Sequence, residues 1–161
     1  MNAAELALPL VYSVECRDTS GRLKWREVIH NLTTTEGKNS LGNVYLRAST
    51  QITAWYVGLK GTGAVSAADT AASHAAWAEF TSYSESVRQT LTLAAFSSGA
   101  SNNSSSPAVF TLNGSGTVGG AFVASVSTKG STSGVLFSVA NFASDQAVAA
   151  SDVLTITVSV A

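Results

Sequence analysis

The sequence predicts a mainly β fold: an antiparallel β-sandwich of the jelly-roll-like type, with one or two short helices in its N-terminal half. The last segment, "DVLTITVSV", alternates strictly between aliphatic and hydroxyl side chains, which is typical of a strand with one face in the core. Before it, short apolar segments recur about every 10 residues with turn-forming residues between them, a spacing typical of sandwiches and barrels. Helix-type patterns are confined to the first half of the chain.

The first predicted element is a β-hairpin. "LVYSVEC" is rich in residues that favour strands, "RDTSG" has the composition of a turn, and "RLKWREVI" returns as the second strand. On that second strand Leu23 and Trp25 share one face, whereas Lys24 and Arg26 share the other. This alternation predicts a strand with one face in water.

The periodicity then changes to that of a helix in "NLTTTEGKNSLGNVYL". Thr33 is followed three residues later by Glu36, the spacing of a capping box that satisfies two free amides at a helix start. Leu41, Val44 and Tyr45 follow at positions that share one helix face. We therefore expect a helix that packs on the sandwich through this face.

Two further elements are predicted in the middle of the chain. "ITAWYVGL" (52–59) is apolar on both faces, which indicates a central strand covered on both sides. "AADTAASHAA" is rich in alanine, and Ser66 and Asp69 have the spacing of a second capping box. These features predict a short helix over about residues 67–76, followed by a strand in "WAEFTSYS".

From Val87 onward the chain is predicted to be all β, with strands in "VRQTLTLAAF", "AVFTLN", "AFVASVS" and "VLFSVANF". "SSGASNNSSSP" (97–107) is expected to be a mobile loop that is too polar to pack. "GSGTVGG" is expected to be a glycine-rich turn. In the terminal strand the core face should consist of Leu154, Ile156, Val158 and Val160.

The chain divides into an N-terminal arm (1–10) and a single β-sandwich domain (11–161). Cys16 is the sole cysteine, so no disulfide can form within the chain. "LALPLVYSVEC" lacks the positive start and the cleavage site of a secretion signal, and no apolar run approaches the roughly 20 residues that span a bilayer. We expect a soluble chain that folds in a reducing cytoplasm and does not bind membranes.

The charge is low and unevenly distributed. Charged residues make up 12% of the chain, against about 25% in typical soluble domains. After Thr90 only Lys129, Asp145 and Asp152 are charged, and the other sixteen charged residues precede that point. A surface so poor in charge suggests shielding by neighbouring copies or by a partner, although a hydroxyl-rich β surface of an ordinary monomer gives the same composition. The absence of a basic patch argues against nucleic-acid binding.

No catalytic or metal-binding pattern is present. On the predicted helix, Asp69 and His74 are separated by about 500° of rotation and would point in different directions. His30 has no nearby carboxylate or cysteine pattern, and the nucleophile motif G-x-S-x-G does not occur. "GSGTVGG" lacks the lysine and the helix that accompany phosphate-binding loops. We expect no catalytic residue, no metal site and no cofactor.

Two further groups of side chains have competing interpretations. Glu79 and Glu85 flank "FTSYS", but a glycosidase needs its two carboxylates held across a cleft, which a sequence cannot show. Several aromatic residues could either form a face on which sugars stack or pack in the core or at an interface. We favour a role in the core or at an interface. These residues are Trp25, Trp55, Trp77 and Tyr83.

Several stretches together resemble a family of small structural proteins of tailed bacteriophages, whose members are labelled as head, decoration or tail-fibre components. They are "VECRDTSGRLKW", "HNLTTTEGKNSL", "TAWYVGLKG", "AADTAASHAAWAEFTSYSESVRQT" and "DVLTITVSV". The resemblance runs from about Val11 to the C-terminus, and Ser151 stands where a glycine is expected. It implies a virion component without catalysis.

The leading hypothesis is a capsid decoration or cement protein, that is, a minor capsid protein on the head surface of a virion assembled in the cytoplasm of the bacterial host. Its expected partners are the major capsid protein and other copies of itself, as a trimer or another small ring. The alternatives are a tail or tail-fibre component that attaches to the host, and an envelope hydrolase acting through Glu79 or Glu85. The expected contact elements are the arm (1–10) and the loop around Asn102.

Overall fold

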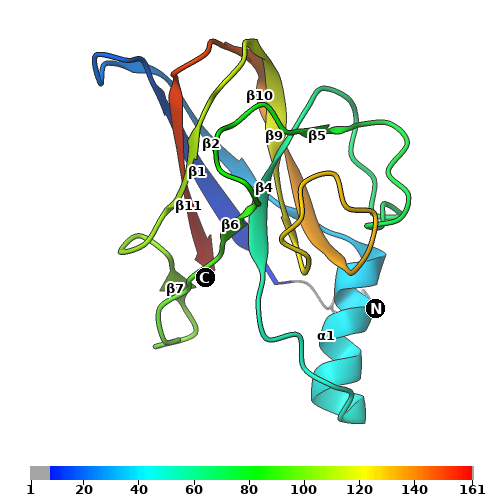
Figure 1. Cartoon of the computed structure of the whole chain (residues 1–161). Helices are drawn as coiled ribbons and strands as arrows, with labels where there is room; N and C mark the ends of the chain where they lie inside the picture. The colour runs from blue at the N-terminus through cyan, green and yellow to red at the C-terminus, as the bar shows by residue number, and fades with distance from the viewer. Residues whose placement is uncertain (1–7, 161) are drawn as a thin grey trace.

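The computed structural model describes residues 8–160, which form two antiparallel sheets that face each other (Figure 1). Sheet A contains, in spatial order, β2 (Leu23–His30), β1 (Leu10–Arg17) and β11 (Val153–Val160), with β7 (Ser101–Asn102) and β8 (Ala108–Thr111) both paired to β11. Sheet B contains β3 (Leu32–Thr33), β10 (Leu136–Val148), β9 (Gly116–Ala124) and β4 (Tyr56–Lys60), with β5 (Glu79–Phe80) and β6 (Gln89–Thr90) both paired to β4. One helix, α1 (Thr35–Arg47), lies in the N-terminal half. The predicted β-sandwich is confirmed. Of the predicted arm, residues 1–7 lie outside the described residues, and Leu10 is already the first residue of β1.

The core between the sheets follows the alternation read from the sequence. On β11, Leu154, Ile156, Val158 and Val160 are buried, whereas the threonines and serine between them are half-exposed. β1 pairs with β11 along its whole length, so that Tyr12 lies opposite Val158. Each large aliphatic side chain buried in this way stabilises the fold by about 1.5–3 kcal/mol. The predicted hairpin of β1 and β2 is also confirmed.

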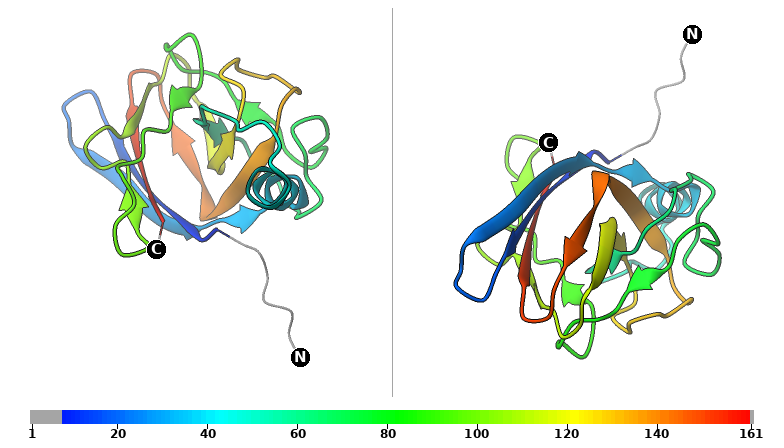
Figure 2. Two further views of the ribbon diagram at one scale, coloured as in Figure 1. Left: turned by 90° about the horizontal axis from the view of Figure 1, so that it is seen from below. Right: turned by 90° about the horizontal axis from the view of Figure 1, so that it is seen from above.

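Both open sides of the sandwich are bridged by the chain itself. On one side β2 passes through Asn31 into β3, which pairs with β10 of the other sheet. The Asn31 side chain accepts a hydrogen bond from the amide of Leu10 (2.9 Å) and donates to the carbonyl of Leu8 (3.1 Å), replacing ladder bonds where the strand changes sheet. On the other side Tyr83 bridges to Leu112, which joins sheet B to β8. Figure 2 views the sandwich from below and from above, with the two sheets facing each other.

Helix α1 begins one residue later than the capping box predicts. Thr34 is the N-cap and accepts a hydrogen bond from the amide of Gly37 (3.0 Å). A Cβ atom on Gly37 would lie 2.2 Å from the carbonyl oxygen of Phe137, so the helix approaches β10 more closely than any larger residue would allow. Glu36 does not complete the box, because its carboxylate binds amides outside the helix. Of the predicted apolar face, Leu41 and Val44 are half-buried but Tyr45 is exposed.

The predicted strand over residues 52–59 is confirmed only in its second half. β4 begins at Tyr56, and its residues Val57 to Lys60 are buried. It pairs with β9 on one side and with β5 and β6 on the other, which confirms the expected central position. The preceding residues, 52–55, lie on the segment that rises beside α1 in Figure 1 and are not part of a strand.

The helix predicted over residues 67–76 is wrong, since this segment consists of turns. The amide of Ser66 donates to the Asp69 carboxylate (2.9 Å), and Thr70 and Ser73 exchange backbone hydrogen bonds that close a tight turn. Short polar side chains of this kind compete with helical hydrogen bonds, and a helix of about 10 residues is marginal without packing on one face. Local polar contacts therefore override the helix propensity of the alanines.

Two expectations in the second half also need correction. The segment 97–107 is anchored to the sandwich at its centre, where Ser101–Asn102 is strand β7 and Asn103 is fully buried, whereas residues 97–100 and 104–106 are exposed as expected of a loop. Its side-chain oxygen accepts a hydrogen bond from the amide of Val158 (2.7 Å), which explains why a polar residue is buried here. The expected glycine-rich turn is shorter than predicted, because Gly116 to Gly120 belong to β9. A Cβ on Gly120 would lie 1.9 Å from the carbonyl oxygen of Ala140, so close strand packing requires glycine there.

Candidate functional site

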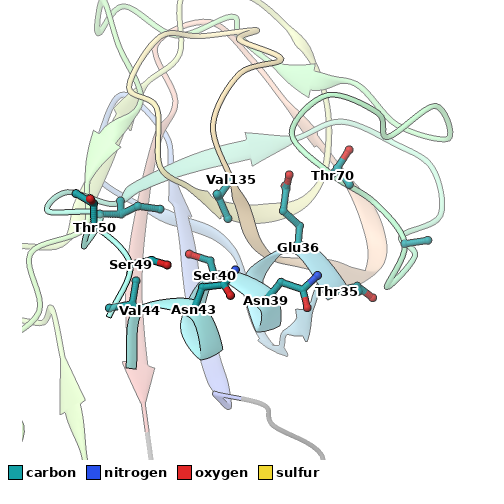
Figure 3. Close-up of a pocket in the computed structure, with 12 residues that line it drawn as sticks. Thr35, Glu36, Asn39, Ser40, Asn43, Val44, Ser49, Thr50, Thr70 and Val135 are labelled. Carbon is teal, nitrogen blue, oxygen red and sulfur yellow. The ribbon is translucent and has the colours of Figure 1, made fainter. Parts of the chain in front are cut away.

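A groove with a volume of about 650 Å³ lies beside α1 (Figure 3). Its walls come from α1, from the segment that follows the helix and from the loop before β5. Most of its lining side chains carry hydroxyl or amide groups. The lining residues are Thr35, Glu36, Asn39, Ser40, Asn43, Val44, Ser49, Thr50, Ile52, Ala68, Thr70 and Val135.

Glu36 is the one ionisable residue among those lining this groove, and its carboxylate is already bound. It accepts hydrogen bonds from the amides of Ala71 (2.9 Å) and Leu136 (2.6 Å). Figure 3 shows its side chain rising from α1 between Val135 and Thr70. This carboxylate therefore fixes the loop before β5 and the start of β10 to the helix. The groove offers hydrogen-bonding groups but no second acid or base to work with Glu36.

Asp69 and His74 both contact Trp77, and neither is bound to the other. The indole Nε1 of Trp77 donates to Asp69 (2.9 Å). The His74 ring stacks on the Trp77 ring with centroids 4.0 Å apart, and its Nδ1 lies 2.9 Å from the Trp77 carbonyl oxygen. Residues 67–76 are not helical, so the expected rotation between Asp69 and His74 does not apply. The two side chains nevertheless bind different groups of Trp77, the indole Nε1 and the carbonyl oxygen, and both hold the loop before β5 in place.

Glu79 and Glu85 are also engaged in structural contacts. Glu79 forms a two-point ion pair with Arg88 (3.0 and 2.8 Å), and both side chains are about 95% buried, with 4% and 5% of their surface exposed. The Glu79 carboxylate also accepts from the amide of Gly130 (2.6 Å). Glu85 accepts from the amide of Thr111 with both oxygens (3.0 and 3.1 Å). Glu79 is among the residues that line a pocket of about 460 Å³, but Glu85 is not, so the two carboxylates are not held across that pocket as a glycosidase requires.

The aromatic residues considered as a sugar-stacking face lie in or against the core. Trp77 and Tyr83 are buried, at 6% and 1% exposed. Trp25 packs edge-on against Phe142, and Trp55 against Phe137, with centroids 5.5 and 5.3 Å apart. These arrangements match the core interpretation of aromatic side chains.

A buried lysine, Lys60 on β4, escaped the sequence analysis. Its Nζ donates to the carbonyl oxygens of Gly61 (2.9 Å) and Gly63 (2.5 Å), and it lies 5.8 Å from the centre of the Trp77 ring. Burial lowers the pKa of this amine. The sequence feature that could have indicated this burial is a lysine at the end of an apolar strand, directly before "GTG". Glycines have no side chain to cover their carbonyl oxygens, so a lysine next to them in the chain can donate to those oxygens.

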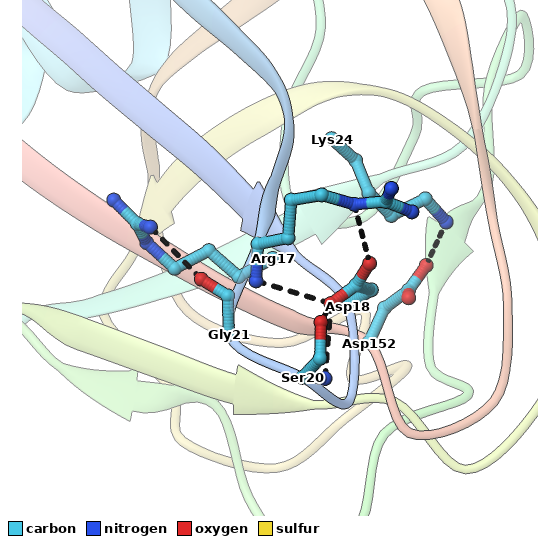
Figure 4. Close-up of polar contacts among 7 residues, drawn as sticks. Arg17, Asp18, Ser20, Gly21, Lys24 and Asp152 are labelled. Atoms are coloured by element: carbon cyan, nitrogen blue, oxygen red, sulfur yellow. Dashed lines mark hydrogen bonds and ion pairs between the residues drawn. The ribbon is translucent and has the colours of Figure 1, made fainter.

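A second polar cluster holds the end of the sandwich where β1 turns into β2 (Figure 4). Asp18 accepts hydrogen bonds from Ser20 and Arg22, and these contacts lower the pKa of its carboxyl to about 2. Lys24 on β2 pairs with Asp152 (2.5 Å), and this hydrogen bond raises the pKa of the lysine. The cluster connects the first hairpin to the turn before β11.

Cys16 lies beneath this cluster on the core face of β1. It is fully buried, and burial, followed by the negative charge of Asp152, raises the pKa of its thiol to about 11. A thiol in this environment is a small core residue. Within residues 8–160 no group of three or more His, Cys, Asp and Glu side chains is arranged to hold a metal ion. In that part of the chain, no helix has the length and apolarity that a membrane-spanning helix requires.

Comparison of the chain with protein-family models, with curated proteins and with solved structures gives no significant match in any of the three. The function must therefore be argued from the surface and the contacts of the molecule.

Proposed function

We propose that the chain is a non-enzymatic structural protein of a tailed-bacteriophage virion, and specifically a capsid decoration or cement protein that binds and stabilises the major capsid lattice. The observation that carries the proposal is the near absence of exposed charge over residues 91–160, all of which are described. Of the charged residues there, Asp152 is buried and paired with Lys24, and Lys129 donates to the carbonyl oxygen of Tyr83 (2.7 Å). Asp145 is exposed and Lys129 is half-exposed, so these two are the charges that this region presents to water.

The outer face of sheet A is the part of this surface best suited to contact. On β11 its outward side chains are short, since Thr155, Thr157 and Ser159 alternate with the buried aliphatic residues. The neighbouring outer positions of β1 and β2 carry the charged pair of Glu15 and Arg26. Helix α1 packs by β10 on the far side of the sandwich and leaves this face open, as both views in Figure 2 show. Burying the β11 part of this face removes no charged side chain from water, so the desolvation cost of docking there is small.

A protein of this kind acts through many copies. On a symmetric shell each copy needs only modest affinity, because the same contact repeats at every equivalent position and the total stabilisation grows with copy number. The proposed partners are the major capsid protein and other copies of this chain, on the head surface. The family resemblance of the sequence supports the same class of function.

The segment around Asn102 remains a proposed contact element. Asn102 itself is exposed, whereas Asn103 beside it is fixed in the core, so the tip of this segment is held in place from beneath. A pre-ordered tip loses little conformational freedom on binding, which favours affinity. The other proposed contact element, the arm, lies mostly outside the described residues.

The test is immunogold electron microscopy of purified virions with an antibody raised against this chain. Virions from a phage with the gene deleted, or the antibody absorbed with purified protein, give the background. Gold over the head supports the proposal. Gold confined to the tail would overturn it in favour of a tail or fibre component, and no labelling above background would exclude a virion protein altogether.

A further inference from the structure

Asn113 lies in the bend that takes the chain from β8 in sheet A to β9 in sheet B, and the next residue is Gly114. This is the one Asn–Gly pair in the sequence. Asn113 is exposed and lies outside both strands. Within residues 8–160, neither its side-chain amide nor the backbone amide of Gly114 makes a hydrogen bond. No contact therefore holds either group away from the other.

Two amides placed in this way can react, because asparagine is a chemically labile residue and glycine has no Cβ to hinder the approach. The backbone nitrogen of Gly114 bonds to the side-chain carbonyl carbon of Asn113. The side-chain nitrogen leaves as ammonia and takes the proton of the Gly114 amide, which gives a cyclic imide. Water then opens the imide at either of its carbonyl carbons and returns a proton to the nitrogen. One opening gives aspartate, and the other gives isoaspartate, in which the backbone runs through the former side-chain carbon.

We propose that Asn113 is a site of spontaneous deamidation, at which the bend between the sheets gains a carboxylate and, in the isoaspartyl product, one more backbone carbon. The reaction consumes water and releases ammonia, and it needs no other reactant. Each modified chain is one unit more negative than the formal net charge of −1. The new charge falls in the half of the chain that carries the fewest charges. The site does not depend on the proposed virion function.

The other asparagines in the described part of the chain lack this combination of features. The side-chain oxygens of Asn31 and Asn103 accept hydrogen bonds from backbone amides. Asn102 is exposed, but it belongs to β7 and its side-chain oxygen accepts from the amide of Ser104 (2.9 Å). Three others lie within α1 or β10, where the regular backbone opposes ring closure, and they are Asn39, Asn43 and Asn141. Asn113 should therefore react first.

The two products should affect the fold differently, because the bend is tied to both sheets. The amide of Asn113 donates to the carbonyl oxygen of Ser82 (3.2 Å), and the amide of Leu112 donates to the carbonyl oxygen of Asp152 (2.8 Å). An added backbone carbon lengthens the connection between Leu112 and β9, so these bonds cannot all keep their geometry. We expect the isoaspartyl form to melt at a lower temperature than the unmodified chain. The aspartyl form keeps the original backbone and should melt with it.

The test is incubation of the full-length protein in mildly alkaline buffer, followed by peptide mapping with mass spectrometry. The peptide that contains Asn113 should gain the mass difference between an amide and a carboxylic acid, and one of its two forms should react with an isoaspartyl methyltransferase. The matched control is Gly114→Ala, which should slow the reaction at least about tenfold because the added methyl group hinders the attack. Its Cβ would lie 3.4 Å from the Cβ of Ser82, an ordinary contact, and the φ of Gly114 is not positive. Circular dichroism verifies that the variant is folded.

Three results would each overturn the proposed site: a folded chain that does not gain mass at Asn113, equal rates in the wild type and in Gly114→Ala, or a faster reaction at Asn102. A second measurement tests the effect on the fold. Ion exchange separates the modified chains, and thermal unfolding compares them with the wild type and with Asn113→Asp, which carries the charge on an unchanged backbone. An isoaspartyl form that melts with Asn113→Asp would overturn the proposed effect on the bend.

Discussion

The guanidinium of Arg88 and the carboxylate of Glu79 form a two-point ion pair from which water is almost excluded, and together they hold separate loops on one end of sheet B. Besides Glu79, Arg88 donates to the carbonyl oxygens of Val126 (2.8 Å) and Ser131 (3.2 Å). Its guanidinium also lies 5.0 Å from the centre of the Phe122 ring. The fold therefore depends on this pair.

Removing one partner of this pair should be strongly destabilising. Glu79→Ala leaves Arg88 as an uncompensated buried charge, and we expect a loss of about 3–5 kcal/mol in the free energy of unfolding. Urea titration followed by circular dichroism measures it. The matched control is Glu15→Ala, which removes the more exposed ion pair with Arg17 and should cost less than about 1 kcal/mol. Equal losses in the two variants would show that burial of the Glu79 pair has no energetic consequence.

The buried amide of Asn103 should contribute more than its exposed neighbour. Asn103→Ala leaves the amide of Val158 without its partner, so we expect a loss of about 1–3 kcal/mol. Asn102→Ala, at an exposed position in the same segment, should change stability by less than about 0.5 kcal/mol. Thermal unfolding of both variants checks the difference. If the two variants melt alike, the segment 97–107 is not anchored to β11 through Asn103.

Gly37 should not tolerate alanine, although alanine favours helices in general. The added Cβ would lie 2.2 Å from the carbonyl oxygen of Phe137, so α1 and β10 must separate. We expect a loss of about 1–3 kcal/mol, the range for overpacked sites. Asn39→Ala, at an exposed position of the same helix, should be neutral or slightly stabilising. A Gly37→Ala protein as stable as wild type would mean that the helix does not pack as closely as described.

Cys16 should make the fold sensitive to alkaline pH. Burial raises its pKa from 9.0 to about 11, so in this interval the folded chain keeps a proton that the unfolded chain has lost. This contribution to the free energy of unfolding is complete below pH 9 and is lost as pH rises through 11, about 3 kcal/mol in total. Urea unfolding of wild type and Cys16→Ala at a series of pH values tests this. The decrease in stability with pH should be shallower in the variant, and identical slopes would contradict the assignment.

The strands that alternate in sequence were predictable because their periodicity reflects burial directly. In β11 and in the hairpin of β1 and β2, the alternation of apolar and polar residues can be read within each segment without knowing which strand it pairs with. Residues 67–76 were mistaken for a helix because the decisive partner of Asp69 is the indole of Trp77, a contact that no local pattern displays. The N-cap was misplaced by one residue for a related reason, since Glu36 binds an amide 100 residues away.

The features of the candidate surfaces were least accessible from sequence. From the sequence, Lys60 would be placed at the surface, as most lysines are. In the structure it is buried, and its amine donates to the carbonyl oxygens of Gly61 and Gly63. Asn103 belongs to a polar, repetitive stretch, and its burial follows from the position of β11 alone. The low charge of residues 91–160 was visible from the composition, and the structure adds that Asp152 is buried and paired with Lys24, while Lys129 is half-buried and donates to the carbonyl oxygen of Tyr83.

The corner at Asn31 determines how the sandwich would carry a mechanical load. Its side chain holds the carbonyl of Leu8 and the amide of Leu10, just where the chain enters the fold. A pull on the chain ahead of Leu8 would therefore reach β1 and the bend between β2 and β3 at the same time. Because β1 lies between β2 and β11 in sheet A and β3 pairs with β10 in sheet B, a tether at this end would load strands of both sheets at once.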